Sequence, residues 1–389
     1  MNSDQSSTET NNGGIWSWAL CAVIVATFFE ALSFTVLYPV LPKFVLGVGG
    51  DLAAVGLVIG AFNIVAILSR PLGGLLSDRW GRKPLLVVGG LISTIALVGL
   101  LWCSSLTLLV PLRMLHGAAE AAFYVSAAAA VTDLVPRNRR SAAISIFSLA
   151  FLVAFSVGPL LGERLTLLSF DIAWMVAAGF SITAAAISVL IVLPAITSEA
   201  PSGDFLGHRR ALFPGALFAA TLVGYAGFTA YASLYAETFS PDLVGMLFLT
   251  YGIVMGATRL LAGGLPDLLG PRLVAVVAMV GSAAGLLMLG SACSPSVAIL
   301  ATAIFACGQA LCFPALLSIA LHGATDAQRG RLVGTFTAFL DIGLTVGALL
   351  FGAIVAGSSV AVAFSLSALL TLAAAAALQL SERSDRSAK

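Results

Sequence analysis

Residues 74–84 read GLLSDRWGRKP, a short charged break between two long apolar runs, 52–76 and 84–102. Each run approaches the roughly 20 apolar residues that a helix needs to cross the hydrocarbon core of a membrane. Gly81 permits a tight turn between two helices, and the basic residues around it are typical of a loop on the cytoplasmic side. The stretch therefore predicts two membrane helices joined by a basic loop.

The composition of the whole chain is that of a protein that lies in lipid. Of its 389 residues, 59% are hydrophobic and only 10% are charged, and the mean hydropathy is +1.05. A soluble chain carries about 25% charged residues. The apolar runs are also too long for the ~10-residue strands of a membrane barrel. We predict an all-α membrane protein with twelve spans, at about 16–42, 52–76, 84–102, 106–132, 141–161, 172–193, 212–236, 243–265, 272–291, 297–321, 332–356 and 359–380.

The basic residues predict the orientation of these spans. If both termini are cytoplasmic, the cytoplasmic breaks and tail hold 14 Lys and Arg residues, and the opposite side holds only Lys43 and Arg164. Such an excess marks the cytoplasmic side of a membrane protein. We expect a multi-pass protein of the cell (inner or plasma) membrane with both termini in the cytoplasm.

The two halves of the chain repeat at an offset of 189 residues. Arg70 corresponds to Arg259, and Asp78 corresponds to Asp267. A constant offset across several breaks means that both halves share one topology, so two pseudo-symmetric six-helix bundles are expected. We predict a polar cytoplasmic N-terminus at 1–14, an N-terminal bundle at 15–193, a cytoplasmic linker at 194–211, a C-terminal bundle at 212–380 and a cytoplasmic tail at 381–389.

The loop at 74–84 matches the signature GxLaDRxGRKxxL at nearly every position, and the chain therefore resembles the major facilitator superfamily. The resemblance implies a conformational latch, in which Asp78 caps span 11 near Leu332. Gly74 is expected to let span 2 approach a neighbouring helix closely, and the basic residues are expected to pair with Asp78 or with the end of span 4. The predicted latch residues are Gly74, Asp78, Arg79, Gly81, Arg82, Lys83 and Asp133.

A basic loop that only sets the topology is the alternative, but topology requires neither Asp78 nor the two glycines. The second copy of the loop, residues 263–272, keeps Asp267 and Gly270 and loses most of the basic residues. We therefore expect the N-terminal copy to dominate.

Span 4 contains Arg113-x-x-His116-Gly117, which resembles the superfamily's RxxQG motif with His in place of Gln. The resemblance implies that Arg113 is linked to proton transfer. Glu120 lies seven residues after Arg113, two turns along the same helix face. A structural arginine bonded to backbone carbonyls is the alternative, although intramembrane charges are costly and usually face a cavity.

Acids deep in the membrane are the candidates for proton coupling. Glu30 has no opposite charge at helical spacing on span 1, and the P-x-x-P end of that span at 39–42 resembles the twelve-span drug:proton antiporters. Because burial favours the neutral form of an acid, we expect Glu30 to carry the proton, Glu120 to act as a charge partner of Arg113, and Asp341 to be next in line. A protonated Glu30 that only bonds a neighbouring helix is the alternative.

Span 5 ends in Gly158-Pro159-x-x-Gly162, which resembles the core of the superfamily's antiporter motif, gxxxGPxxGG. Gly158 allows close packing, and Pro159 kinks a helix; an ordinary helix-end Gly-Pro is the alternative. The resemblance also implies that spans 1, 4, 7 and 10 line a central cavity, where tyrosine and glutamine side chains find hydrogen-bond partners. The cavity candidates are Phe34, Tyr38, Asn63, His116, Tyr225, Phe228, Tyr231, Gln309 and Phe313.

Together these features favour a secondary active transporter that exports small drug-like or amphipathic molecules in exchange for protons by alternating access. An exporter of a sugar, siderophore or other metabolite is the nearest alternative, followed by a proton-coupled uptake symporter. A channel or a membrane-embedded enzyme is disfavoured by the repeat and by the lack of a catalytic cluster in the sequence.

The expected partners follow from the same composition. They are a small-molecule substrate, protons and the lipid bilayer. The balance of 19 basic against 18 acidic residues argues against nucleic acid, which requires a basic excess. No P-loop sequence for ATP occurs, and no cofactor, metal or catalytic residue is expected. We expect a monomer.

Overall fold

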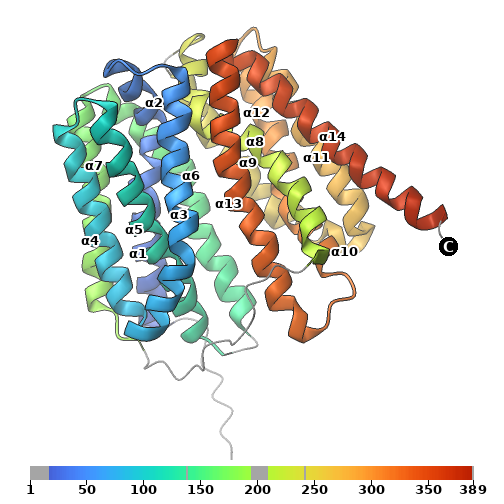
Figure 1. Ribbon diagram of the computed structural model, residues 1–389, viewed down its shortest axis with the longest axis horizontal. Helices are drawn as coiled ribbons and strands as arrows, with labels where there is room; N and C mark the ends of the chain where they lie inside the picture. The colour runs from blue at the N-terminus through green and yellow to red at the C-terminus, as the bar shows by residue number, and fades with distance from the viewer. Residues whose placement is uncertain (1–16, 137–138, 194–208, 241, 388–389) are drawn as a thin grey trace, which may run out of the picture.

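The computed structural model describes residues 17–136, 139–193, 209–240 and 242–387, and it is helical almost throughout (Figure 1). Within these residues, twelve helices are long and apolar enough to cross a membrane, as predicted, and no strand occurs. The helices are α1 Trp18–Thr35, α2 Leu37–Gly47, α3 Leu52–Trp80, α4 Arg82–Gly99 with η1 Leu100–Trp102, α5 Leu106–Asp133, α6 Arg140–Thr166, α7 Phe170–Leu190, α8 Arg209–Glu237, α9 Leu243–Ala262, α10 Leu265–Leu269, α11 Pro271–Gly290, α12 Pro295–Leu321, α13 Asp326–Gly357 and α14 Val360–Ser387.

Several boundaries differ from the predicted ones. α13 begins at Asp326, six residues before the expected start near Leu332. α8 begins at Arg209, inside the stretch expected to be linker, and α14 continues to Ser387, into the expected tail. The predicted N-terminal segment 1–14 and residues 194–208 of the predicted linker lie outside the described residues.

The sequence starts and ends these helices by local chemistry. Asp51 caps α3, because its carboxylate accepts the backbone N–H of Ala54 at 2.8 Å, and such caps satisfy donors that a helix start leaves free. Gly81 joins α3 to α4 with φ of +98°, and the corresponding Gly270 precedes α11 with φ of +87°. Positive φ favours glycine, so the turn predicted at Gly81 is confirmed, and Gly270 adopts the same conformation in the second half.

The helices form two bundles, α1–α7 and α8–α14. Figure 1 shows the first, blue to green, beside the second, yellow to red. Two helix pairs join the bundles, α3 with α13 and α6 with α9, and α2 also packs on α8. The end that carries the α3–α4 turn is named the basic end here, and the end where α3 begins is named the opposite end.

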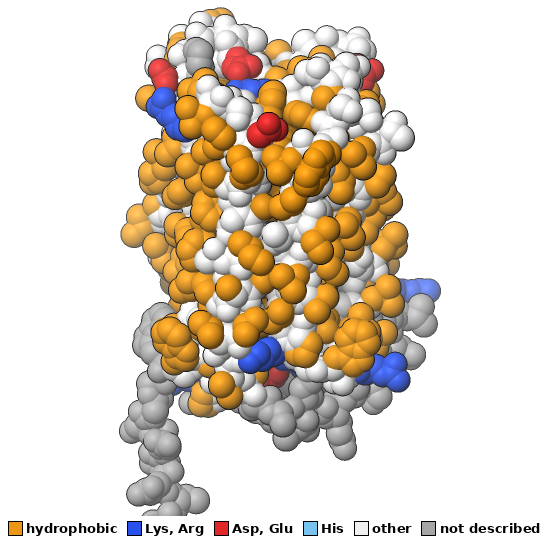
Figure 2. Space-filling view, turned by 90° about the vertical axis from the view of Figure 1, so that its left-hand side faces the viewer, with side chains coloured by type: hydrophobic (Ala, Val, Ile, Leu, Met, Phe, Trp, Pro, Cys, Tyr) orange, Lys and Arg blue, Asp and Glu red, His pale blue; other side chains and the backbone are white. Residues whose placement is uncertain are grey.

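The surface fits a position in a lipid bilayer. In Figure 2, hydrophobic side chains cover the middle of the visible face, and charged side chains gather towards its two ends. Leu68, Leu72 and Ile95 are each 60% or more exposed. A soluble monomer rarely exposes a contiguous apolar surface of this extent, so the chain is a multi-pass membrane protein.

Candidate functional site

An ion pair joins the two halves in the second half of α3, on the side of the basic end. The guanidinium of Arg70 contacts the carboxylate of Asp341 on α13, and it also lies 5.3 Å from the ring centroid of Tyr124 on α5. The Asp341 side chain is 12% exposed and that of Arg70 is 30% exposed. Sequence reasoning selected Asp341 but treated Arg70 only as part of the repeat. A basic residue inside the predicted span 52–76, which contains no acid, is the signal that a partner lies on another helix.

Glu120 on α5 lies beside this pair. It is 6% exposed, and its carboxyl makes no hydrogen bond or ion pair among the residues whose side chains are described. The charged groups that act on it are Arg70, Glu30 and Asp341. The expected pairing with Arg113 along the same helix is therefore not what the structure contains, because the cation close to Glu120 comes from another helix.

Arg113 and His116 form a separate group against α3. The Nη1 atom of Arg113 lies 2.8 Å from Nδ1 of His116, and the guanidinium carbon lies 4.4 Å from the ring centroid of Phe62. A Cβ at Gly117 would overlap the carbonyl oxygen of Phe62, so this glycine lets α5 approach α3. The Nε atom of Arg113 and the Nε2 atom of His116 are buried without partners in the described part of the chain.

Glu30 lies inside the N-terminal bundle. Its Oε1 atom is 2.6 Å from the hydroxyl of Ser93 on α4, and its Oε2 atom is 2.7 Å from the hydroxyl of Ser181 on α7. The Ser181 hydroxyl is also 3.0 Å from the carbonyl oxygen of Gly90. Glu30 is 2% exposed. All of its hydrogen-bond partners therefore belong to its own half.

The residues of the predicted latch meet at the basic end. Arg82 pairs with Asp78, donates its Nε–H to Asp133 at 3.1 Å and donates to the Ser77 hydroxyl at 3.2 Å. These groups all belong to the N-terminal half. The predicted contact of Asp78 with the start of α13 is not tested, because the side chains there at 326–327 and 329–331 lie outside the described residues. Arg79 is exposed and Lys83 is half-buried.

Gly74 lies against α5, but the contact there does not require a glycine. A Cβ at Gly74 would have its nearest contact 3.8 Å away, at Val125, which is an ordinary distance. A Cβ at the preceding Gly73 would lie 3.3 Å from the Cα atom of Ala122. Both glycines face α5, but only Gly73 lies close enough to its backbone for a Cβ to be tight there.

The antiporter-like motif brings α6 against the junction of α1 and α2. A Cβ at Gly158 would overlap the Thr35 hydroxyl, and one at Gly162 would overlap the carbonyl oxygen of Val36. Thr35 donates to the carbonyl oxygen of Ala154 at 3.0 Å. The close packing expected at Gly158 is confirmed, and α6 continues through the buried Pro159.

Aromatic rings from both halves meet in a single group, here named the aromatic cluster. The ring centroids of Tyr38 and Phe155 lie 5.1 Å apart. Phe155 in turn contacts Tyr225 of the second half, with centroids 5.6 Å apart. Sequence reasoning found only the members on α2 and α8, because it considered spacing along single helices. The cluster comprises Tyr38, Phe155, Tyr225, Phe228, Phe248, Tyr251 and Phe305.

The remaining cavity candidates are dispersed. Phe34 contacts Tyr38 and Phe62. Asn63 is half-buried on α3. Gln309 and Phe313 instead lie inside the C-terminal bundle, as two contacts show. The Ser282 hydroxyl donates to the Gln309 side chain at 3.4 Å, and the Phe313 ring packs on those of Phe218 and Phe336.

The opposite end holds the other links between the halves. The Tyr231 hydroxyl donates to the carbonyl oxygen of Leu52 at 2.7 Å. Lys43 lies 2.8 Å from Glu163 of its own half and 2.7 Å from Glu237 of the other half. Tyr231 was expected in a cavity, but it is fully buried and joins α8 to the start of α3.

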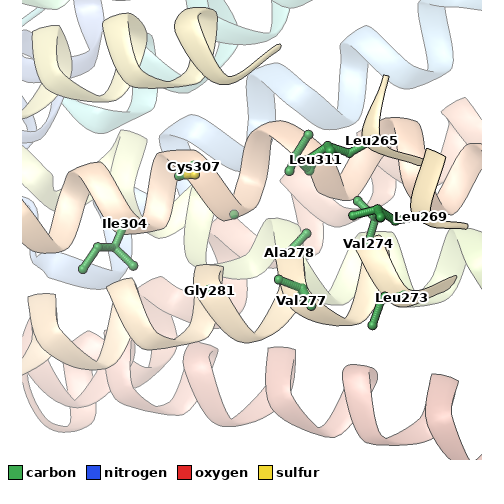
Figure 3. A pocket seen from close by; sticks show the side chains of 11 residues that line it. Leu265, Leu269, Leu273, Val274, Val277, Ala278, Gly281, Ile304, Cys307 and Leu311 are labelled. Carbon is green, nitrogen blue, oxygen red and sulfur yellow. The ribbon is translucent and has the colours of Figure 1, made fainter. Parts of the chain in front are cut away.

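A groove on the C-terminal bundle contains none of these residues. It lies between α10, α11 and α12, and Figure 3 shows that Leu269, Leu273 and Val277 border it with Ile304 and Cys307. Leu269, Leu273 and Val277 are each more than half exposed, so the groove faces the lipid side of the bundle. No group of three potential metal ligands occurs among the described residues.

Twelve apolar helices in two repeated bundles, joined by charged and aromatic contacts, define a membrane transporter of small molecules and not an enzyme. The chain belongs to the Major Facilitator Superfamily, which it matches over residues 23–239 and 212–389.

Curated relatives support this assignment. The multi-drug resistance efflux pump PmrA of Streptococcus pneumoniae is 25% identical over 374 residues, which cover 89% of this chain and 90% of that protein. The multidrug resistance protein MdtG of Serratia proteamaculans is 25% identical and covers 92% of each chain. The class E tetracycline resistance protein of Escherichia coli is 24% identical, over 84% of this chain and 85% of its own length.

Solved structures share the fold. The nucleoside transporter NupG superposes with a TM-score of 0.75 at 13% identity, over 94% of this chain and 99% of that one. A bacterial homologue of the human lysosomal transporter Spinster gives a TM-score of 0.74 at 15% identity, over 94% and 96%. At these identities the likeness concerns the fold alone.

Proposed function

We propose that this chain exports small, drug-like or amphipathic molecules in exchange for protons by alternating access. A relative named as a multi-drug resistance efflux pump and another named as a multidrug resistance protein support export of such molecules. The antiporter-like packing of Gly158 and Gly162 against the α1–α2 junction is consistent with the same direction.

The single observation that carries proton coupling is the position of Glu120. A buried carboxyl without a hydrogen-bond or ion-pair partner among the described residues is costly when charged, so it has a reason to exchange a proton. It also lies beside the Arg70–Asp341 pair, which joins the two halves. A proton on Glu120 therefore changes the charge next to a contact between the bundles.

The coupling follows from the charges. When Glu120 is ionised, Arg70 is attracted by two carboxylates, one from each half, and its hold on Asp341 weakens. When Glu120 is protonated, Arg70 has Asp341 as its only charged partner in this group, and α3 is held on α13. Protonation thus favours the arrangement in which these two helices meet.

Glu30 has a different role in this proposal. The Ser181 hydroxyl has one hydrogen but faces two acceptors, Glu30 and the Gly90 carbonyl. A protonated Glu30 resolves this, because its own hydrogen goes to Ser181 and the Ser181 hydrogen goes to Gly90. Every group then has a partner. We therefore assign Glu30 as a protonated structural acid that binds α1 to α4 and α7, and Glu120 as the proton carrier, in the reverse of the order expected from sequence.

The orientation completes the proposal. With the basic end in the cytoplasm, the contacts at Tyr231, Lys43 and Glu237 lie towards the outside. The arrangement described is then one closed to the outside, and export requires these contacts to open.

Purified protein in sealed vesicles tests the assignment. A pH gradient is imposed, and uptake of a panel of amphipathic dyes and neutral sugars is followed together with proton flux. We expect Glu120→Gln to lose gradient-driven accumulation by at least about tenfold while substrate exchange without a gradient survives, since about 1.4 kcal/mol of coupling corresponds to that factor.

Glu30→Gln is the matched control, because it removes the other buried acid of the same half. It should keep most of the accumulation, since an amide still bonds two serines. Loss of accumulation in Glu30→Gln with normal transport in Glu120→Gln would restore Glu30 as the carrier. Sugar-driven proton flux without dye-driven flux would point to a metabolite transporter.

A further inference from the structure

The α3–α13 and α6–α9 contacts occupy corresponding places at the 189-residue offset, but their charges differ. Arg259 on α9 corresponds to Arg70, and Leu152 on α6 corresponds to Asp341. In the α3–α13 contact the arginine has a carboxylate partner. In the α6–α9 contact an apolar side chain stands where that carboxylate would be.

The side of α9 that carries Arg259 faces α6. A Cβ at Gly256, three residues earlier, would lie 2.9 Å from the Cδ2 atom of Leu152, and one at Gly252 would overlap the Ser156 hydroxyl. Residues three and seven apart share one helix face, so Arg259 lies on the same face. No carboxylate pairs with Arg259 in the described part of the chain, and the side chains that act electrostatically on it are Tyr225 and Tyr251.

Both tyrosines have unused hydrogen-bonding capacity. The Tyr251 side chain is completely buried, and its hydroxyl has no hydrogen-bond partner among the described residues. No hydrogen bond of the Tyr225 hydroxyl is found there either. The Tyr225 ring stacks on Phe155, with centroids 5.6 Å apart and an angle of 26° between the planes. The Tyr225 and Tyr251 rings lie 5.6 Å apart, so within the described residues two hydroxyls without partners and a guanidinium without a carboxylate lie near one another where the halves join.

This combination selects a chemical class. The guanidinium fork binds carboxylate or phosphate oxygens through two parallel hydrogen bonds. A tyrosine hydroxyl donates a further hydrogen bond to the same group, and aromatic rings accommodate a flat apolar body. An unpaired cation in a membrane span is costly and marks a substrate or ion pathway. A bound anion would satisfy Arg259, Tyr225 and Tyr251 together.

We propose that Arg259, Tyr225 and Tyr251 bind an oxyanion of the transported molecule, so that the substrates include amphipathic organic anions with a flat aromatic body. The proposal rests on the proposed export function, and it adds the charge of the substrate. Arg259 is exposed, as entry of a ligand requires.

The phosphate of an anionic lipid offers the same chemistry, since Leu260 and Leu261 beside Arg259 are 75% and 88% exposed. The test therefore needs two arms. The first uses a xanthene dye that carries a free benzoate and its methyl ester, which differ only in the anion. The second compares vesicles of neutral phosphatidylcholine with vesicles that also contain phosphatidylglycerol.

Dye binding to the purified wild-type protein and to Arg259→Gln is measured by fluorescence anisotropy in each vesicle type. We expect Arg259→Gln to weaken binding of the benzoate dye at least about tenfold and binding of the ester less than about twofold, in both vesicle types; tenfold corresponds to about 1.4 kcal/mol. Leu152→Asp is the second variant. It supplies Arg259 with the carboxylate that Asp341 gives Arg70, and it should weaken benzoate binding similarly while Arg259 stays in place.

Equal losses for the acid and the ester, or no loss for either, would overturn the proposal. So would a variant effect seen only with phosphatidylglycerol, which would assign the site to a lipid headgroup. Failure of the proposed function is separate, because binding requires no gradient. If the benzoate preference depends on Arg259 but no dye moves with protons, the anion site stands and proton-coupled export does not.

Discussion

The α3–α13 and α6–α9 contacts are built from corresponding residues, and they differ in the charged side chains that each contains. One has an arginine paired across the halves, with a second acid beside it. In the α6–α9 contact, the corresponding Arg259 lies near two tyrosines, and Leu152 takes the place of the acid. The repeat thus keeps its helices and changes one charge, and we propose that this change separates two tasks. We assign proton coupling to the paired side and recognition of substrate charge to the unpaired side.

Removal of the carboxylate from the paired side should have the largest effect. Asp341→Asn leaves Arg70 without its partner on α13, and loss of one member of a buried pair costs about 3–5 kcal/mol, or less here because Arg70 is 30% exposed. We expect gradient-driven dye export to fall at least about tenfold, measured as initial rate per folded protein in vesicles.

Leu152→Asn is the control at the corresponding position of the other side, and its export rate should stay within about a factor of two, since it leaves no unpaired charge. The exchange of Arg70→Asp with Asp341→Arg should recover part of the lost rate. An Asp341→Asn protein that transports at the wild-type rate would remove the ion pair from the mechanism.

The difference between the two sides marks how far the sequence alone leads. Run lengths predict the twelve spans, and the offset of 189 residues predicts two like bundles, because both depend only on spacing along the chain. The partner of Glu120 was not predictable in this way. Spacing along α5 indicated Arg113, but the rotation of α3 against α5 brings Arg70 close instead.

The same limit explains the glycines of α3. Residues 73 and 74 are both glycine, and spacing along the chain does not tell which one lies closer to the neighbouring helix; in the structure it is Gly73. By contrast, the positive φ at Gly81 and Gly270 was predictable, because a tight turn between two spans requires a glycine whatever the helices do.

Two corresponding glycines, Gly56 and Gly245, allow a second test of the difference between the two contacts, with a smaller expected effect. A Cβ at Gly56 would lie 2.6 Å from the backbone oxygen of Ala348 on α13, which cannot move without its helix. A Cβ at the corresponding Gly245 would meet the end of the Leu160 side chain at 2.5 Å, which can rotate away. Gly56→Ala should therefore separate α3 from α13 and lower export about threefold to tenfold, whereas Gly245→Ala should lower it less than about twofold.

Spin labels at the exposed positions 57 and 350 would report the separation directly, in a background without the native cysteines. The distance distribution should lengthen in Gly56→Ala and stay unchanged in Gly245→Ala. If Gly245→Ala were the more damaging of the two, the α6–α9 contact would be the tighter one during transport.

The smallest expected effect concerns the α3–α4 turn at the basic end and the corresponding α10–α11 turn. Arg82, with 9% of its side chain exposed, pairs with both Asp78 and Asp133. The residue that corresponds to Arg82 in the second half is Pro271, which has no charge. Asp267, which corresponds to Asp78, is exposed and makes no ion pair within the described residues.

Asp78→Asn should therefore lower export about twofold to fivefold with little change in the melting temperature, because Arg82 retains Asp133 and a half-exposed pair contributes about 1 kcal/mol or less. Asp267→Asn should leave export within error of the wild type, since it removes no partner. Export rates and thermal melting of both purified variants are the measurements. Equal losses in the two variants, or unfolding of both, would mean that the two turns have the same structural role. The difference between the halves would then lie only at the α3–α13 and α6–α9 contacts.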